Sequence, residues 1–472
     1  MQTHLSILVF ALSLLATLFV SYLGRRYEAR HRGAALATHG LNKWLLGLSA
    51  GATANSGFVV TAAVGLGYTQ GARWLLLPLA WLLGDILFWT FFPQRINAVG
   101  KRADAATMVD VLVSGTHGRS RRFLRITLGV ITLGCLGGYV SAQWISGQKF
   151  LSGAFDLDNV SSLVAFAAVI VVYTALGGFR GSVYADNLQA AIRIVGTAIA
   201  LVAVWVAASR APAAFQSNLE SAGPDFLHLA PTGGLGLAIA SSLGFAAAAL
   251  GFGLGQPQIV TRYMAGSSPK ETRSAWWIYI LFVQVTWIAM TAFGIALRGV
   301  MPTLDDPETG LSAFHRATTG PLITGIIAAD IFATIAATSN SILVAMAQSV
   351  KFDLLNPRRE DRTGRADLWI PITVLGVITM VVSLFLHSSV KDLALSSVGM
   401  MGAGVAPAMM IQVLGWRRSG WSLLCSVIVG FTTAALWTSL GYNAFMNEAA
   451  PGILAGLLVN WALSRRLHTN GT

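Results

Sequence analysis

Charged residues are scarce in this sequence, and cysteines are scarcer still. Only 11% of the 472 residues are Asp, Glu, Lys or Arg, whereas 54% are hydrophobic. A soluble chain of this length needs far more charge on its surface, so the composition predicts a polytopic membrane protein. The two cysteines, Cys135 and Cys425, lie in apolar stretches, which argues against a disulfide framework.

Several patterns that carry chemistry are also missing. The sequence shows no cluster of metal ligands and no nucleophile paired with a base, so we do not expect an enzyme. The glycine-rich residues 251–256 have the wrong spacing for a dinucleotide fingerprint. Arg25-Arg26 follows the first apolar stretch without a small-residue cleavage site, which predicts a retained helix rather than a signal peptide. No soluble domain fits between the apolar stretches, and no appended signalling domain is expected.

What the sequence does contain is a series of thirteen apolar stretches. About 20 residues suffice to cross a bilayer as a helix. The stretches cover residues 4–23, 44–66, 74–92, 123–148, 159–177, 187–207, 232–256, 275–297, 321–350, 369–387, 392–414, 420–440 and 446–464. We therefore predict an all-α membrane protein with a single transmembrane domain over residues 1–472.

The net charge of +12 has a topological explanation. Most of the Lys and Arg residues lie in the loops on one side of the predicted membrane. The positive-inside rule then places the N-terminus outside and the C-terminus in the cytoplasm, across a cell (inner) membrane. Nucleic-acid binding is therefore not expected. The basic residues of those loops are Arg25, Arg26, Arg30, Arg32, Arg95, Lys101, Arg102, Arg119, Arg121, Arg122, Arg358, Arg359, Arg362, Arg365, Arg417, Arg418, Arg465 and Arg466.

The uncharged stretch at residues 44–68 is long enough to span a bilayer, yet its middle is small and polar. Gly51 and Gly57 flank the Asn55-Ser56 pair, which is a poor sequence for a rigid helix. Non-helical backbone at membrane depth needs protein or a water-filled cavity to satisfy its polar groups. Such a break typically marks a transporter's binding site, whereas close helix packing is the structural alternative for the same small residues.

A second glycine-rich run, residues 246–255, follows five stretches later. Two interrupted spans five apart predict two five-helix repeats of inverted topology, although glycine is common enough for chance to produce the echo. The repeats would cover residues 44–207 and 232–414. Residues 4–23 would form an extra N-terminal helix, and residues 420–464 two C-terminal helices.

The ninth stretch carries a polar face. Asp330, Thr334, Thr338 and Ser341 recur with helical spacing, and Ala337 lies on the same face. Inserting a carboxylate at this depth costs about 2.5–3.5 kcal/mol, so we expect Asp330 to face a cavity or a partner. Hydroxyl and carbonyl oxygens beside a carboxylate suit a small hard cation. The alternative for these hydroxyls is a hydrogen bond to their own helix.

Four short motifs occur in order along the chain. They are Tyr173-Thr174-Ala175-Leu176-Gly177-Gly178-Phe179 with Asp186-Asn187-Leu188-Gln189, Gly255-Gln256-Pro257-Gln258-Ile259 with Arg262-Tyr263-Met264-Ala265, Ala337-Thr338-Ser339-Asn340-Ser341 with Leu343-Val344 and Asp353, and Thr107 with Asp110. Together they resemble the sodium/solute symporter family, and within it the proline-transporter branch, over nearly the whole chain.

The resemblance implies a LeuT-type fold of two inverted five-helix repeats within about 13 transmembrane helices. It also implies symport of a small organic solute with Na⁺, at a sodium site between the broken second span and the ninth. The residues that match this site are Ala52, Asn55 and Thr334 through their carbonyls, Thr338 through its hydroxyl, and Ala337. Asp186 matches a carboxylate on the cytoplasmic ion exit path.

Two departures from the family pattern weaken the implied ion site. Ala337 replaces a serine hydroxyl ligand, and Ala54 replaces an aspartate that the proline branch uses in the broken helix. Asp330 lies about two turns outward on the same face and has no evident structural partner in the sequence. We expect it either to supply the missing charge to Na⁺ or to carry a proton, which makes H⁺ the alternative coupling ion.

The resemblance places the solute pocket beside the ion. Ala249 and Gly253 are small where the proline branch has aromatic residues, so we expect Phe252 to form the lid and the solute to be bulkier than proline or bound differently. Tyr139 and Gln143 are expected to bond either the solute or a neighbouring helix, and the N–H groups near Ser56 to bind a carboxylate. The predicted pocket residues are Ser56, Gly57, Tyr139, Gln143, Ala249, Phe252, Gly253 and Pro257.

The leading functional prediction is a secondary transporter that carries a small organic solute, such as an amino acid or a carboxylate, into the cell by alternating access. The first alternative is a proton-coupled or uncoupled carrier of the same fold. The second is a transporter-like sensor that binds its solute and acts through a signalling partner. The expected partners are the solute and the lipid bilayer, with a homo-oligomer as a further option.

Overall fold

A computed structural model describes the chain except for residues 1, 31–39, 230–233, 356–367, 387–388 and 470–472. Its regular elements are helices, and the extended pairing recorded for the described residues is one parallel bridge, Leu41 to Gly266. The elements are α1 Gln2–Arg30, α2 Lys43–Ala54, α3 Gly57–Val60, α4 Ala62–Gln70, η2 Gly71–Leu75, α5 Leu76–Phe91, α6 Pro93–Arg102, α7 Met108–Leu112, α8 Gly118–Phe155, α9 Asn159–Arg210, α10 Pro212–Ser221, α11 Gly234–Gly255, α12 Pro257–Met264, α13 Pro269–Ser274, α14 Trp276–Val300, η3 Pro307–Thr309, α15 Gly310–Thr318, α16 Pro321–Gln348, η4 Ser349–Leu354, α17 Trp369–Leu384, α18 Val390–Leu414, α19 Gly420–Ser439, η6 Tyr442–Ala444 and α20 Ala449–Thr469.

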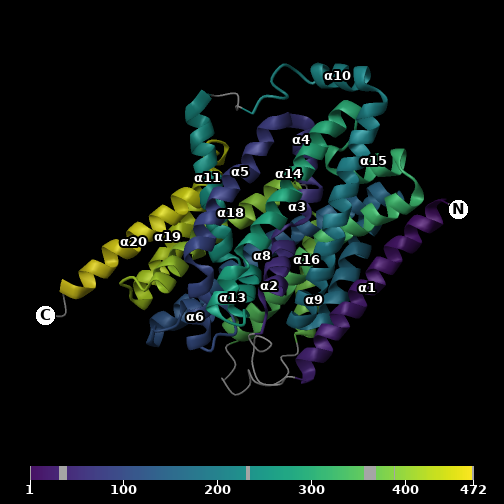
Figure 1. Ribbon diagram of the computed structural model, residues 1–472. Helices are drawn as coiled ribbons and strands as arrows, with labels where there is room; N and C mark the ends of the chain where they lie inside the picture. The colour runs from purple at the N-terminus through teal and green to yellow at the C-terminus, as the bar shows by residue number, and fades with distance from the viewer. Residues whose placement is uncertain (1, 31–39, 230–233, 356–367, 387–388, 470–472) are drawn as a thin grey trace.

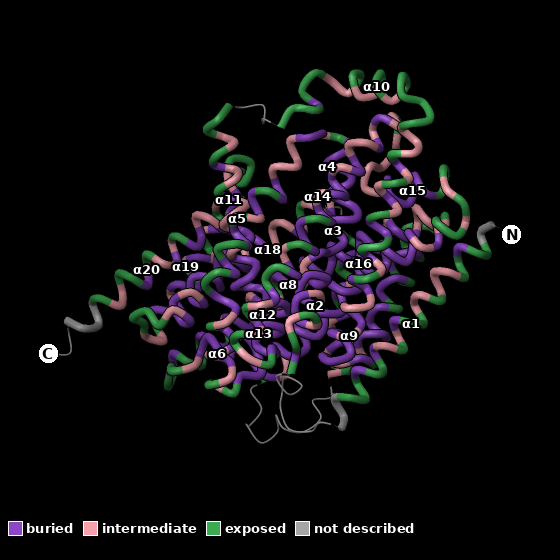
Figure 2. Tube along the Cα trace, viewed as in Figure 1, coloured by how far each residue is buried: buried purple, intermediate pink, exposed green. Residues whose placement is uncertain are grey.

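The long helices form one bundle, with α1 along one flank and α19 and α20 along the other (Figure 1). The short helix α10 lies across one end, and α6 and α13 lie at the opposite end. Burial is concentrated at the centre, whereas α1, α10 and α20 show long exposed stretches (Figure 2). In α16, 78% of the most apolar window is buried, against 17% in α1. The helix with the predicted polar face is therefore the central one.

Nine helical segments among the described residues are long and apolar enough to cross a membrane, which supports a membrane protein. This number is below thirteen partly because continuous helices contain more than one predicted stretch. The 52-residue α9 contains the fifth and sixth stretches, joined at Gly178, where φ is 67° and ψ is −171°. Glycine adopts this conformation readily because it has no Cβ, and the kink in α9 therefore lies at a glycine.

The second helix break lies further along the chain than the sequence analysis placed it. We expected an interruption within residues 246–255, but α11 runs unbroken to Gly255. The chain leaves the helix at Gln256, with φ of −88° and ψ of 109°, and α12 begins at Pro257. Proline has no N–H to donate and favours the first position of a helix, so Pro257 rather than the glycine run sets the break.

Glycines allow α4 and α14 to approach backbone to backbone. A Cβ at Gly67 would collide with the Thr291 carbonyl oxygen, and one at Gly294 would collide with the Val64 carbonyl oxygen. Small residues at a helix interface permit this close packing. At these two glycines the helices therefore contact each other through main-chain atoms.

A buried histidine in α15 is expected to make the protein acid-sensitive. His315 is 0% exposed, and its ring stacks on Phe293 with centroids 6.1 Å apart. Burial lowers its pKa from 6.5 to about 4. The unfolded chain binds the proton first, so the free energy of unfolding should fall by about 3 kcal/mol as the pH drops from about 6.5 to about 4.

Thermal unfolding in detergent across this pH range measures the effect. His315→Phe keeps a ring against Phe293 and removes the titrating group, so its melting temperature should fall less on acidification than that of the wild type. His228, whose side chain is 68% exposed, offers a matched control as His228→Phe. Equal acid sensitivity of wild type and His315→Phe would contradict the prediction.

Candidate functional site

The predicted interruption of the second stretch is present between α2 and α3. Helix α2 ends at Ala54, Asn55 adopts φ of −84° and ψ of 73°, and Ser56 caps α3 with its side chain. The Ser56 N–H donates to the Ala54 carbonyl at 3.0 Å rather than to Ala52, and the Val59 N–H donates to Ser56 at 2.9 Å rather than to Asn55. The carbonyls of Ala52 and Asn55 therefore lose their usual helical donors and become available to a ligand.

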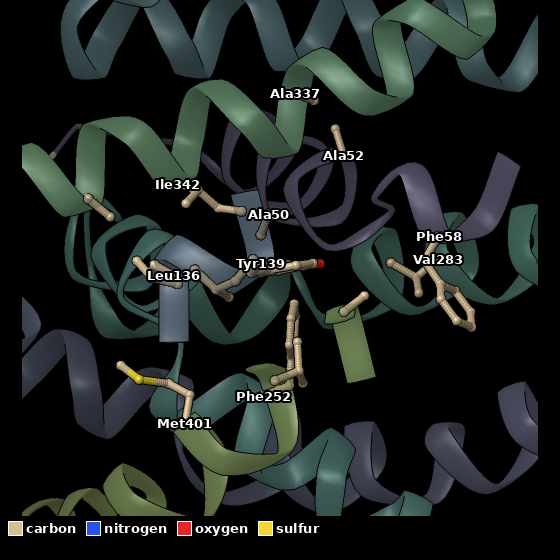
Figure 3. Close-up of a cluster of buried hydrophobic side chains, with 14 of the residues drawn as sticks. Ala50, Ala52, Phe58, Leu136, Tyr139, Phe252, Val283, Ala337, Ile342 and Met401 are labelled. Carbon is tan, nitrogen blue, oxygen red and sulfur yellow. The ribbon is translucent and has the colours of Figure 1, made fainter. Parts of the chain in front are cut away.

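Helix α16 packs against this break. The Thr338 hydroxyl donates to the Thr53 carbonyl at 2.9 Å, where the N–H of Gly57 would bond in a continuous helix. That N–H donates instead to Gln143 Oε1 at 2.8 Å. Figure 3 shows Ala337 on α16 near Ala52 on α2. The structure thus brings together the two helices that the resemblance assigns to the sodium site.

Asp330 faces a partner, as expected for a carboxylate at its depth, although the sequence did not show which residue this is. Its Oδ2 accepts from Nη1 of Arg193 in α9 at 2.8 Å, and both side chains are almost fully buried. The Thr334 hydroxyl donates to the Asp330 carbonyl at 2.9 Å, which is the helix bond considered as its alternative role. Arg193 therefore compensates the charge of Asp330, which corrects the view that this carboxylate has no structural partner, and its role with Na⁺ or a proton stays a prediction.

Asp186 belongs to a second buried ion pair. Its Oδ2 accepts from Arg262 Nη2 at 2.6 Å and from Ser49 at 2.7 Å. Arg262 also donates to Ser341 at 2.6 Å, so the network joins α2, α9, α12 and α16. Arg262 is 1% exposed and Asp186 is fully buried. The carboxylate that the resemblance places on the exit path is thus paired with Arg262, a residue of the second motif.

Three further motif residues also meet. Thr107 donates to Asp353 Oδ1 at 2.8 Å, and Arg125 of α8 contacts Asp110 at 2.7 Å and Asp353 at 3.5 Å. Thr107 and Asp110 form a capping box on α7. These motif residues therefore hold α7, α8 and η4 together.

A small cavity of about 40 Å³ lies beside the break. This is the volume open to the centre of a water molecule, and one water needs about 10–15 Å³ of it, so the cavity has room for about three waters. Its wall is mostly apolar and includes five aromatic side chains, and no charged side chain is part of the lining. The lining residues are Ala54, Asn55, Ser56, Phe58, Val59, Trp81, Tyr139, Phe252, Val283, Trp287, Ala394, Leu395 and Val398.

Three predicted pocket residues, Ser56, Tyr139 and Phe252, line this cavity. The ring of Tyr139 and that of Phe252 approach each other from α8 and α11 (Figure 3). Asn55 is an addition to the set. Its Nδ2 donates to Thr286, while its buried Oδ1 has no hydrogen-bond partner. That oxygen is free to accept from a solute or to bind an ion.

The other predicted pocket residues lie outside the cavity lining. Gln143 and Gly57 bond each other, so this N–H is not free for a carboxylate. Pro257 begins α12. Helix α5 packs closely on Ala249 through Gly84, and the Phe88 ring lies 2.7 Å from where a Cβ on Gly253 would stand. The space that we expected Ala249 and Gly253 to open is therefore filled by α5.

Comparison with known proteins agrees with this architecture. The model of the sodium:solute symporter family matches residues 35–430. The osmoregulated proline transporter OpuE of Bacillus subtilis (strain 168) is 25% identical over 91% of this chain and 89% of its own length. The high-affinity proline transporter PutP of the same strain is 24% identical over 93% and 94%.

Solved structures show the fold. A substrate-bound, outward-open Na⁺-coupled sialic acid symporter superposes with a TM-score of 0.78, covering 98% of both chains at 16% identity. MhsT in complex with L-phenylalanine gives a TM-score of 0.55, covering 89% of this chain and 98% of its own at 14% identity. The fold is that of the LeuT-type transporters. Because the family model covers most of the chain, this protein belongs to the sodium:solute symporter family and is a sodium-coupled symporter of a small solute.

Proposed function

We propose that this chain takes up a small, net-neutral amino acid together with Na⁺. The observation that carries the proposal is the unwound backbone at residues 55–56, which lies between the α16 hydroxyls and the aromatic cavity. Its free carbonyls suit a sodium ion, and the rings of Trp81, Phe252 and Trp287 suit a compact apolar body. The named relatives with 24–25% identity are proline transporters, which makes proline the first solute to test.

The proposed sodium ligands are backbone carbonyls of α2 and α16 with one hydroxyl. Asp330 is left out of direct contact because its carboxylate is bound to Arg193. Asp186 is likewise bound to an arginine, Arg262, and we place this pair on the cytoplasmic route of the ion. The proposed ligands are the carbonyls of Ala52, Asn55, Thr334 and Ala337 and the hydroxyl of Thr338.

This arrangement gives a physical reason for coupling. The charges of Asp186 and Asp330 are each cancelled by an arginine, and the cavity lining has no charged side chain. A sodium ion beside the break therefore has no counter-charge from the protein nearby. A solute carboxylate in the cavity would supply it, so each ligand should raise the affinity of the other by the same factor.

We also propose the orientation that the basic loops favour, with the N-terminus outside and the C-terminus in the cytoplasm of a cell (inner) membrane. Helices α6 and α13, which carry Arg95, Lys101 and Arg273 among others, lie at the same end of the bundle (Figure 1). The loop residues Arg32, Arg358, Arg359, Arg362 and Arg365 lie outside the described residues. Within this orientation, spans two to six and seven to eleven form the two inverted repeats.

Uptake into proteoliposomes tests the function. Labelled proline should accumulate under an inward Na⁺ gradient and not when K⁺ replaces Na⁺. Prolinamide, which lacks the carboxylate, should neither accumulate nor raise Na⁺ affinity. Accumulation driven by a pH gradient without Na⁺ would favour the proton-coupled alternative. Na⁺-dependent proline binding without counterflow would favour the sensor.

A further inference from the structure

Asp85 of α5 is a buried carboxylate without an arginine. It is 1% exposed and lies one helical turn from Trp81, which lines the cavity. The other buried aspartates of the described chain each have an arginine partner: Asp110 and Asp353 contact Arg125, Asp186 contacts Arg262, and Asp330 contacts Arg193. A charge buried without a partner is costly, so the form in which Asp85 exists needs an explanation.

Its surroundings are polar but carry no opposite charge. The Gln284 side chain of α14 is its neighbour, and the hydroxyls of Tyr263 from α12 and Tyr279 from α14 lie close enough to interact electrostatically with it. Trp89, one turn further along α5, packs on both tyrosines with centroids 5.3 Å away. On the α11 side, Gly84 meets Ala246 and Ala249.

The titratable groups that face Asp85 are thus the two tyrosines. Tyr139 of α8 reaches Tyr279 from the cavity side. Arg262 follows Gln258 by one turn on α12 and adjoins Tyr263, but its guanidinium is bound to Asp186. The charged residues of α6 lie at its exposed or partly exposed positions. Nothing described around Asp85 offers a positive charge to it.

Several polar atoms in this cluster have no hydrogen-bond partner. They include Oδ2 of Asp85, the indole N–H of Trp89, the Tyr263 hydroxyl and both amide atoms of Gln284. Buried polar groups normally have hydrogen-bond partners, so several unpartnered polar atoms in one place indicate a missing ligand. The cluster contains both donors and acceptors, which limits what that ligand can be.

A proton fits this cluster better than a sodium ion. The side chains provide three unpaired oxygen atoms, from Asp85, Gln284 and Tyr263, whereas a hard metal cation is usually held by more oxygens. A single proton on Asp85 removes the buried charge and supplies an O–H that can donate to the Gln284 amide oxygen. When the proton leaves, Trp89, Tyr263 and Gln284 hold N–H and O–H groups that can turn toward the carboxylate.

We propose, on the basis of the symport function above, that Asp85 is a proton-binding site that is occupied when the solute cavity closes and is distinct from the sodium site. Protonation converts the carboxylate into a neutral acid, and deprotonation returns the proton to water, so no other reactant is involved. The site is placed to act on transport, because Trp81 connects it to the cavity and Tyr263 connects it to the Arg262–Asp186 pair.

Equilibrium binding of proline at saturating Na⁺, measured by tryptophan fluorescence in detergent across pH, tests the linkage. As the pH rises through the range where Asp85 ionises in the solute-free protein, the affinity of the wild type for proline should fall. The loss should approach tenfold per pH unit, because one proton is taken up with the solute. Asp85→Asn imitates the neutral acid and should bind with the low-pH affinity at every pH. Asp85→Glu should restore the pH dependence, and the exposed Asp225→Asn should behave as the wild type.

Infrared spectra without solute provide a readout that does not depend on transport. The carbonyl band of a protonated carboxylic acid should be present at low pH, decline as the pH rises, and be smaller in Asp85→Asn than in the wild type. A wild-type spectrum that matches Asp85→Asn at every pH overturns the proposal even if Na⁺-dependent uptake is found. Proline affinity that varies with pH equally in both proteins also overturns it. An Asp85-dependent band without any proline binding retains the proton site and rejects proline as the solute.

Discussion

Replacing Thr338 with valine should abolish most Na⁺-dependent uptake. The substitution keeps the shape of the side chain but removes the hydroxyl that bonds the Thr53 carbonyl at 2.9 Å. It also removes the one side-chain oxygen in the proposed sodium site. Losing a hydrogen bond and an ion ligand together should raise the half-saturating Na⁺ concentration by about tenfold or more, since about 1.4 kcal/mol corresponds to a factor of ten.

Ser339 provides the matched control for this experiment. Its hydroxyl donates to the Ile335 carbonyl of its own helix at 2.7 Å, and it is rotated by about 100° from Thr338. Ser339→Ala should therefore leave the Na⁺ dependence near that of the wild type, and Thr338→Ser should recover much of the lost affinity. Equal losses in Thr338→Val and Ser339→Ala would show that the two hydroxyls serve helix packing alone.

Asp186→Asn should cause the largest loss of stability among single substitutions of charged residues. It leaves the Arg262 guanidinium buried at 1% exposure without a counter-charge. Removing one partner of a buried pair typically costs about 3–5 kcal/mol, and this arginine links α12 to α2, α9 and α16. Thermal unfolding in detergent measures the change.

A double-mutant cycle separates the pair from its parts. Asp186→Asn combined with Arg262→Gln removes both charges, so it should be more stable than Asp186→Asn alone. An exposed ion pair provides the control. Asp306→Asn removes one contact of Lys149, and because the Asp306 side chain is 41% exposed, it should lower the free energy of unfolding by less than about 1 kcal/mol. If the double variant is no more stable than the single one, the pair contributes through shape rather than charge.

The helix break at Asn55 could be predicted from sequence, because glycines and a polar pair interrupt an otherwise apolar stretch. The second break could be placed only approximately. Residues 246–255 look equally interrupted, yet packing against α5 and α18 keeps them helical to Gly255. Tertiary contacts override a weak local preference, whereas the missing N–H of Pro257 cannot be overridden.

The buried ion pairs could not be predicted, because their members are far apart in sequence. Arg193 and Asp330 are separated by 137 residues, and Asp186 and Arg262 by 76. A usable signal was nevertheless present. Arg193 lies within the predicted stretch 187–207 and Asp85 within 74–92, and a charged residue in such a stretch calls for a partner or a function.

The backbone contact between α4 and α14 limits how this protein can evolve. A larger residue at Gly253 meets the Phe88 ring, so a smaller residue at position 88 can make room for it. A larger residue at Gly67 meets the Thr291 carbonyl oxygen instead. Every residue at position 291 has the same main-chain carbonyl. A substitution there therefore cannot make room for a larger residue at Gly67. Evolution can therefore change the contact between α5 and α11 by compensating pairs of side-chain substitutions. The contact between α4 and α14 allows no such compensation where main-chain atoms meet.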